Sequence, residues 1–125
     1  MRIAIIGAPR AGKTTLAREL ARASDIRILH ADDLIALGWS EASDEVAHVL
    51  AAISDIIVEG VAVVRGLRKA LALVPYAPVE RCIVLERPRL RLSRWQVAMQ
   101  RGCATILREI EPELLLRGVT MERPQ

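Results

Sequence analysis

The sequence predicts an α/β fold with three α/β/α layers, in which helices cover both faces of a mostly parallel sheet of four or five strands. Two observations support this prediction. Short runs of consecutive apolar residues alternate along the chain with longer segments whose apolar residues recur at helical spacing. The short runs are apolar throughout, as in strands buried on both faces of a parallel sheet. The 125 residues are expected to form one domain, residues 1–125.

The first half of the chain alternates strands and helices. Arg2–Ile6 is a predicted strand, followed by a helix over Thr14–Ala23 whose leucines share one face. Ile26–Leu29 is the second strand. The next helix is expected to begin at a Ser43 cap and to run to about Ile53, with valines and leucines one turn apart.

The middle of the chain repeats this pattern. Ile56–Glu59 is the third strand, and Val61–Val74 is a helix that Pro75 ends. Arg81–Leu85 is the fourth strand. The pair Ser93 and Gln96 has the spacing of a capping box, which predicts a helix from there to about Met99.

The C-terminal segment is expected to contain two helices and a short strand. A helical pattern covers about Ala104–Leu116, but Pro112 should break it and start a last helix that Gly118 ends. Val119–Glu122 then predicts a short fifth strand.

Composition excludes several classes of protein. Hydrophobic residues make up 52% and charged residues 26% of the chain, which is typical of a folded domain rather than a disordered one. No apolar run approaches the roughly 18 residues of a membrane span. Cys82 and Cys103 do not have the spacing of a disulfide framework or a metal knuckle. We therefore expect a cytoplasmic protein that makes no contact with a membrane.

Positive charge gathers at the C-terminal end. The formal net charge is +3, and residues 81–125 contain nine basic and five acidic residues, a net charge of +4. Such a segment suits an anionic ligand, either a phosphate or a nucleic acid. Arginine outnumbers lysine by 16 to 2, and one of the two lysines, Lys13, lies in the most specific motif of the chain.

That motif, residues 7–14, matches the P-loop pattern G-x-x-x-x-G-K-[ST] between a predicted strand and a predicted helix. Its backbone N–H groups and the helix N-terminus can surround a phosphate. Lys13, expected on a solvent-facing loop, would reach the β- and γ-phosphates of a nucleotide, and the Thr14 hydroxyl would bind Mg²⁺. The predicted nucleotide-binding residues are Gly7, Ala8, Pro9, Arg10, Ala11, Gly12, Lys13, Thr14 and Thr15.

Acidic residues follow the second and third strands. Asp32 and Asp33 are adjacent, so their side chains should point in different directions, one toward a metal and one toward the proton of an attacking hydroxyl. Either residue could instead cap the segment that follows. Glu59 ends the third strand, where its carboxylate could hold a Mg²⁺-bound water. Alternatively, it is only a glutamate at the N-terminus of the next helix, where the helix dipole favours a negative charge. The predicted metal ligands are Thr14, Asp32 and Glu59.

The order of these motifs resembles that of the small P-loop kinases, such as adenylate, shikimate, gluconate, uridine and polynucleotide 5′-hydroxyl kinases. In these proteins a short acidic motif follows the second strand, as His30–Ile35 does here. The runs IIVEGVAVVRGLRKAL and QVAMQRGCATILREIEPELLLRGV are also similar to uncharacterised kinase-like proteins of phages and prophages. The resemblance implies the strand order 2-3-1-4-5, and it suggests Lys13 and Asp33 as catalytic residues, with Asp32 nearer the metal.

The same resemblance implies a short Arg-rich lid over residues 86–101. The candidate lid arginines are Arg87, Arg91 and Arg94, although a solvated basic face or a nucleic-acid contact are alternatives. Arg65 and Arg68 lie three residues apart on one predicted helix face and could grip an anionic acceptor or remain ordinary surface charges.

The expected activity is that of a kinase that uses ATP and Mg²⁺. It would move the γ-phosphoryl group to a hydroxyl of a small molecule, a nucleotide or a nucleic-acid 5′ end. The alternative is an ATP-binding switch or accessory ATPase without an acceptor, and a pure nucleic-acid-binding module is a weaker third possibility. A partner subunit, such as a second copy in a homodimer, could complete the site.

Overall fold

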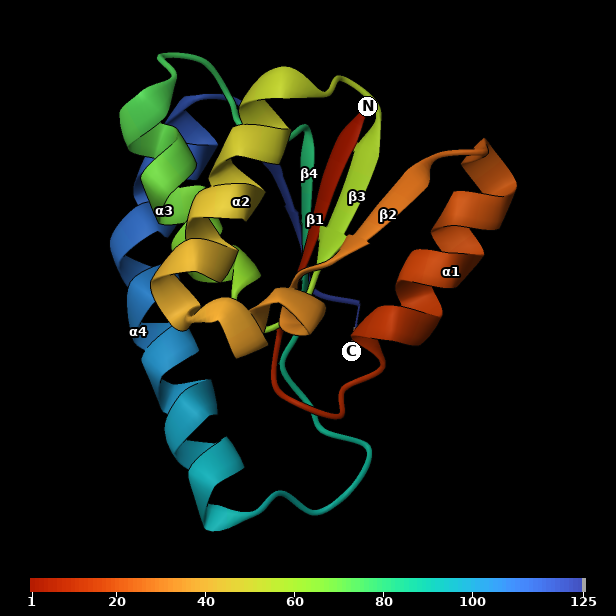
Figure 1. The fold of residues 1–125 in the computed structure, drawn as a ribbon, viewed down its shortest axis with the longest axis vertical. Coiled ribbons are helices and arrows are strands. Elements are labelled where there is room, and N and C mark those ends of the chain that lie inside the picture. Colours follow the sequence, from red (N-terminus) through yellow and green to blue (C-terminus); the bar gives the residue numbers. More distant parts are fainter. Residues whose placement is uncertain (125) are drawn as a thin grey trace.

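The structure, a computed structural model, describes residues 1–124. Five strands form one sheet in the order β2-β3-β1-β4-β5, and all four strand pairs are parallel (Figure 1). This confirms the predicted fold class and strand order. The strands are β1 (Arg2–Gly7), β2 (Arg27–His30), β3 (Ile56–Glu59), β4 (Arg81–Leu85) and β5 (Thr120–Glu122).

The helices form a layer on each side of this sheet. One layer is α1 (Lys13–Ser24), and the other contains α2 (Trp39–Ala52), α3 (Val63–Leu73) and α4 (Arg94–Leu116) (Figure 1). A 3-10 segment, η1 (Ala31–Leu37), links β2 to α2.

Two apolar cores account for the uninterrupted apolar runs of the strands. Ile3 and Ile5 of β1 pack on the α1 side, whereas Ala4 and Ile6 pack under α2, α3 and α4. Because successive side chains of a strand point to opposite faces, a strand covered on both faces must be apolar at every position.

The structure corrects the predicted start of α2. This helix begins at Trp39, four residues before the expected Ser43 cap. Ser43 is buried inside the helix, where its hydroxyl donates to the carbonyl oxygens of Trp39 and Ser40, both at 3.0 Å. A serine within a helix can satisfy its hydroxyl on the preceding turn, and sequence alone does not distinguish this from a cap.

The structure also corrects the predicted break at Pro112, because α4 is one continuous helix of 23 residues. Pro112 is exposed, and so is Arg108, whose carbonyl loses its helical donor and can bond to water instead. The buried face of α4, formed by Cys103, Ile106, Leu107, Ile110 and Leu114, continues across the proline. Packing of this face against the sheet therefore outweighs the cost of the proline.

Replacing Pro112 by alanine is accordingly expected to raise the free energy of unfolding by about 1–3 kcal/mol, since it restores one helical hydrogen bond and removes a steric clash. Urea unfolding monitored by circular dichroism measures this change. Glu109→Ala, an exposed change on the same helix, provides the control. A Pro112→Ala variant that is less stable than the wild type would contradict a continuous helix.

The start of α4 agrees with the prediction. Gln96 N–H donates to Ser93 Oγ at 3.2 Å, and Ser93 N–H donates to Gln96 Oε1 at 2.9 Å, so both halves of the predicted capping box form. The preceding loop, residues 86–93, passes beside the loop between β1 and α1 (Figure 1). Within residues 1–124, no helix is both long and apolar enough to span a membrane.

Candidate active site

A cleft of about 870 Å³ opens at the carboxyl ends of the strands. The P-loop contributes Pro9, Arg10 and Gly12–Thr15 to its walls, and Asp32 and Glu59 enter it from the ends of β2 and β3. Residues of the loop after β4 and of the first turns of α4 close the remaining side. In parallel α/β sheets this edge is the usual place for a ligand.

The P-loop is tightly held against β4. Gly7 has a φ of +135°, and a Cβ added there would lie 2.0 Å from the carbonyl oxygen of Leu85. The Ala8 N–H donates to that same oxygen at 2.9 Å. Only glycine fits both the backbone conformation and the close approach, so the first glycine of the motif is a packing requirement as well as a turn residue.

Lys13 occupies a different environment from the one expected. It is the first residue of α1 and is only 6% exposed, so the expectation of a solvent-facing loop residue was wrong. Its Nζ donates to the Ala8 carbonyl oxygen at 2.6 Å. Burial lowers the pKa of Lys13, and the nearby carboxylates of Asp32 and Glu59 oppose that shift. A buried ammonium favours a negatively charged ligand, which would supply the compensating charge.

Thr14 and Glu59, two of the predicted metal ligands, are in direct contact. The Thr14 hydroxyl donates to both carboxylate oxygens of Glu59, at 3.3 and 3.2 Å. Glu59 is only 3% exposed, and His30 Nδ1 lies 2.9 Å from its Oε1. Hydroxyl and carboxylate oxygens are the protein donors that Mg²⁺ prefers.

Among the described residues, no group of three His, Cys, Asp or Glu side chains forms a ready-made metal cage. This fits Mg²⁺, which usually keeps several waters and takes few ligands from the protein. The contact between His30 and Glu59 was not predicted from the sequence. The position of His30 opposite Glu59 in the register of β2 and β3 explains it.

The adjacent aspartates are placed differently. Asp32 lines the cleft, and its Oδ1 accepts a hydrogen bond of 2.8 Å from the Val61 N–H. Both residues are exposed to solvent, but Asp33 is not among the residues that line the cleft. Desolvation raises the pKa of Asp32, opposed by the Val61 hydrogen bond and by the charge of Lys13.

Gly60 makes room for the Asp32 carboxylate. A Cβ at this position would lie 2.5 Å from Asp32 Oδ1, and the φ of Gly60 is +131°. The backbone after β3 therefore holds one aspartate of the pair in a defined place.

Arg89 reaches the P-loop. It belongs to the predicted Arg-rich lid segment, although it was not one of the three lid arginines singled out from the sequence. It lines the cleft, and its guanidinium carbon would lie 2.9 Å from a Cβ added to Gly12. Its backbone N–H donates to the Arg10 carbonyl oxygen at 2.8 Å, which fixes the loop after β4 against the P-loop. Four arginines occur within eight residues of that segment, and the sequence does not indicate which of them contacts the P-loop.

The arginines chosen from the sequence lie elsewhere. Arg87, Arg91 and Arg94 are exposed and do not line the cleft. Arg65 lies over the ring of Trp39, 5.4 Å from its centroid, and Arg68 pairs with Glu109 at 3.6 Å on the surface. Neither of the last two lines the cleft.

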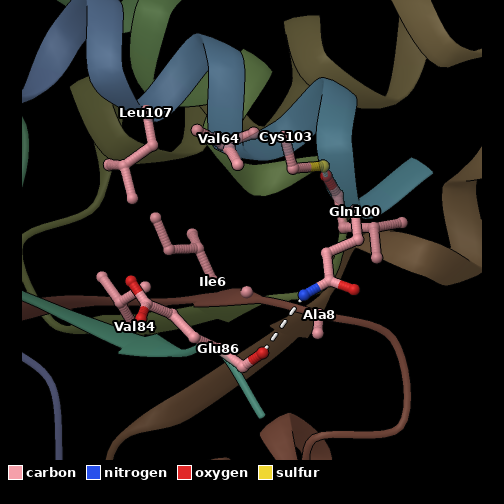
Figure 2. A pocket seen from close by; sticks show the side chains of 11 residues that line it. Ile6, Ala8, Val64, Val84, Glu86, Gln100, Cys103 and Leu107 are labelled. Carbon is pink, nitrogen blue, oxygen red and sulfur yellow. Dashed lines mark hydrogen bonds between the residues drawn. The ribbon is translucent and has the colours of Figure 1, made fainter. Parts of the chain in front are cut away.

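A second cavity of about 230 Å³ lies on the other side of the P-loop, beneath α4. Its walls are mainly aliphatic, including Ile6, Val64, Val84 and Leu107 (Figure 2). The Gln100 side-chain N–H donates to the Glu86 carbonyl oxygen at 3.2 Å and links α4 to the end of β4. This cavity has no cationic lining residue, so it does not suit a phosphate.

Comparisons with known proteins connect this geometry to a fold. No family model matches the chain, and no curated protein matches it in sequence. Among solved structures, shikimate kinase from Aquifex aeolicus has a TM-score of 0.54 and 15% identity, covering 98% of this chain and 85% of that one. This chain has the fold of the small P-loop kinases.

Two further structures with the P-loop kinase fold are similar. Shikimate kinase from Bacteroides thetaiotaomicron has a TM-score of 0.51 and 14% identity, covering 98% of this chain and 86% of that one. Shikimate kinase from Acinetobacter baumannii, in complex with shikimate, has a TM-score of 0.55 and 14% identity, covering 99% and 82%. At these identities the likeness concerns the fold.

Proposed function

We propose that this protein is a kinase that transfers the γ-phosphoryl group of ATP to a hydroxyl group of a small acceptor. The observation that carries the proposal is the position of Asp32. This carboxylate lines the same cleft as the P-loop lysine, the Thr14–Glu59 pair and Arg89. A nucleotide hydrolase or switch needs the phosphate-binding groups, whereas a carboxylate beside them suits an attacking hydroxyl.

The residues present fit Mg-ATP. The P-loop backbone and the Lys13 ammonium would hold the phosphates, and Thr14 and Glu59 would hold Mg²⁺ directly or through water. When bound, Mg²⁺ would neutralise negative charge on the phosphates. Arg89 lies beside Gly12, where it would add positive charge to the migrating group.

The chemical step needs one base and one leaving group. The acceptor oxygen bonds to the γ-phosphorus while the bond from that phosphorus to the β–γ bridging oxygen breaks, and ADP leaves. The hydroxyl proton passes to a carboxylate. We assign this role to Asp32, which lines the cleft, rather than to Asp33, which the family resemblance suggested but which does not line it. The Val61 N–H keeps Asp32 oriented.

Replacing Arg89 by alanine is expected to lower kcat about a hundredfold or more, because charge stabilisation of the transferring phosphoryl group is lost. ADP release at saturating Mg-ATP measures the effect. Arg91→Ala removes an equal charge two residues away, outside the cleft lining, and should leave kcat close to that of the wild type. Equal losses in both variants would indicate a general electrostatic effect and would remove Arg89 from the site.

The proposed function is tested by ADP release from Mg-ATP with and without a small-molecule extract of the source cells. Turnover that the extract stimulates supports a kinase and allows the acceptor to be purified by fractionation. Slow turnover that neither small hydroxyl compounds nor oligonucleotide 5′ ends stimulate would contradict the proposal and favour an ATP-binding switch or accessory ATPase.

A further inference from the structure

The walls of the cleft distinguish between classes of acceptor. We propose that the acceptor is a hydroxyl compound with a flat, apolar ring body, such as a nucleoside, rather than a polyhydroxylated acid. This inference rests on the proposed kinase function. It concerns only the part of the cleft that residues outside the P-loop line.

Few polar groups remain for the acceptor once the phosphate side is set apart. Lys13, Thr14 and Glu59 interact within the P-loop and metal region. Arg10 belongs to the P-loop, and the Arg89 guanidinium lies beside Gly12, so we assign both cations to the phosphate side of the cleft. Thr15 follows directly in the same motif.

The polar side chains of Ser93 and Gln96 are bonded to each other's backbone in the capping box. Among the lining residues, this leaves the Asp32 carboxylate as the polar side chain not engaged with the P-loop, the metal region or the cap.

The other lining residues away from the P-loop are apolar, and two are tryptophans. Trp95 is 64% exposed and Leu90 is 62% exposed, although both line the cleft. Large apolar side chains that gather at a cleft in contact with water usually mark a binding surface. The set consists of Ile35, Trp39, Val61, Leu90, Trp95 and Met99.

The two arginines that the sequence suggested for an anionic acceptor, Arg65 and Arg68, lie outside the cleft. Arg65 stacks over Trp39, and Arg68 pairs with Glu109, and neither lines the cleft. An acid with several hydroxyls would find few side-chain partners for its polar groups here. A flat ring can instead stack on tryptophan.

Tryptophan fluorescence tests this inference directly, because the chain has two tryptophans and both line the cleft. The protein is saturated with Mg-ADP and titrated with thymidine, benzyl alcohol, ribose and shikimate. Thymidine should quench the emission in a saturable way, and ribose and shikimate should not. Benzyl alcohol shows whether a flat ring is enough for binding. Quenching by benzyl alcohol indicates that it is, whereas quenching by thymidine but not by benzyl alcohol indicates that polar groups at the edge of the base also contribute.

Matched variants locate the binding surface. Trp39→Leu is expected to weaken thymidine binding about tenfold, measured on the remaining Trp95 emission, or by calorimetry if that emission no longer responds. Tyr76→Leu removes an aromatic ring that packs on Arg2, at the opposite end of β1, and should bind thymidine as the wild type does.

Shikimate or ribose binding as tightly as thymidine would overturn the inference, and so would no binding of thymidine or benzyl alcohol. Because these titrations involve no phosphoryl transfer, they are independent of the kinase assay. Stimulated ADP release without ring binding refutes only the acceptor class, whereas ring binding without any acceptor-stimulated ADP release refutes the kinase function.

Discussion

Replacing Lys13 by methionine is expected to lower ADP formation by about a hundred- to a thousandfold without lowering the stability of the protein. The loss of activity follows from the removal of a positive charge that lies in the phosphate cradle and is hydrogen-bonded to the Ala8 carbonyl. Stability should be retained because the buried ammonium is costly to the fold, as its lowered pKa indicates.

The pH dependence of this effect has a defined sign. Since the pKa of Lys13 is lower in the folded protein than its ordinary value of 10.5, the unfolded chain binds more protons between the folded pKa and 10.5. Wild-type stability therefore rises with pH in that window, through this group. Relative to the wild type, the stability of Lys13→Met should be greatest below the folded pKa and should decline as pH approaches 10.5.

The second lysine of the chain provides a matched control. Lys69 pairs with Asp44 at 2.7 Å on the surface between α3 and α2, so Lys69→Met should keep full activity. ADP release and urea unfolding of the two variants test the prediction together. A Lys13→Met protein with wild-type turnover would remove the P-loop assignment. A Lys13→Met protein that is clearly destabilised at neutral pH would show that the ammonium stabilises the fold.

Replacing Asp32 by asparagine is expected to lower acceptor phosphorylation by about a hundred- to ten-thousandfold while ATP binding changes little. Asparagine keeps an oxygen that can accept from the Val61 N–H, so the side chain should stay in place without its ability to take a proton. Steady-state kinetics and calorimetric titration with ATP measure the two effects separately.

Asp33→Asn is the matched control for this variant. It makes the same change in the adjacent residue, which does not line the cleft, and it should leave the rate nearly unchanged. The reverse pattern, a large loss in Asp33→Asn and little in Asp32→Asn, would return the role of base to Asp33.

Asp32 should also set the acid side of the pH–rate profile. Its pKa is raised above the ordinary 3.8, so the base becomes protonated, and kcat/KM falls, as pH decreases through a value above 3.8. That limb should disappear in Asp32→Asn. Its persistence would show that another group is responsible for it.

Local sequence patterns predicted correctly those strands that are buried on both faces. The bounds of β3 and β4 match the predicted strands Ile56–Glu59 and Arg81–Leu85, because uninterrupted apolar runs between turn residues are characteristic of strands covered on both faces. Ser43 and Pro112 were misread for one reason. A local preference for a cap or a break costs a few kcal/mol at most, and the packing of a helix face can exceed it.

The candidate site divides in the same way. The P-loop is a continuous motif, so its residues were identified directly. Asp32 and Glu59 could be placed near it because the ends of parallel strands meet at one edge. Which of Asp32 and Asp33 enters the cleft could not be predicted from the sequence, because it depends on the Val61 N–H and on the space beside Gly60.

The sequence alone predicted the strands, the P-loop motif and the acidic residues after β2 and β3, because each depends on neighbours along the chain or on the period of a strand or helix. The tertiary structure decided which arginine and which aspartate enter the cleft, and it brought Trp39 and Trp95 to the walls of one cleft. These outcomes depend on contacts between distant segments, such as the backbone hydrogen bond from Arg89 to Arg10. The spacing of residues along the chain does not predict such contacts, because the packing of whole helices and strands determines them.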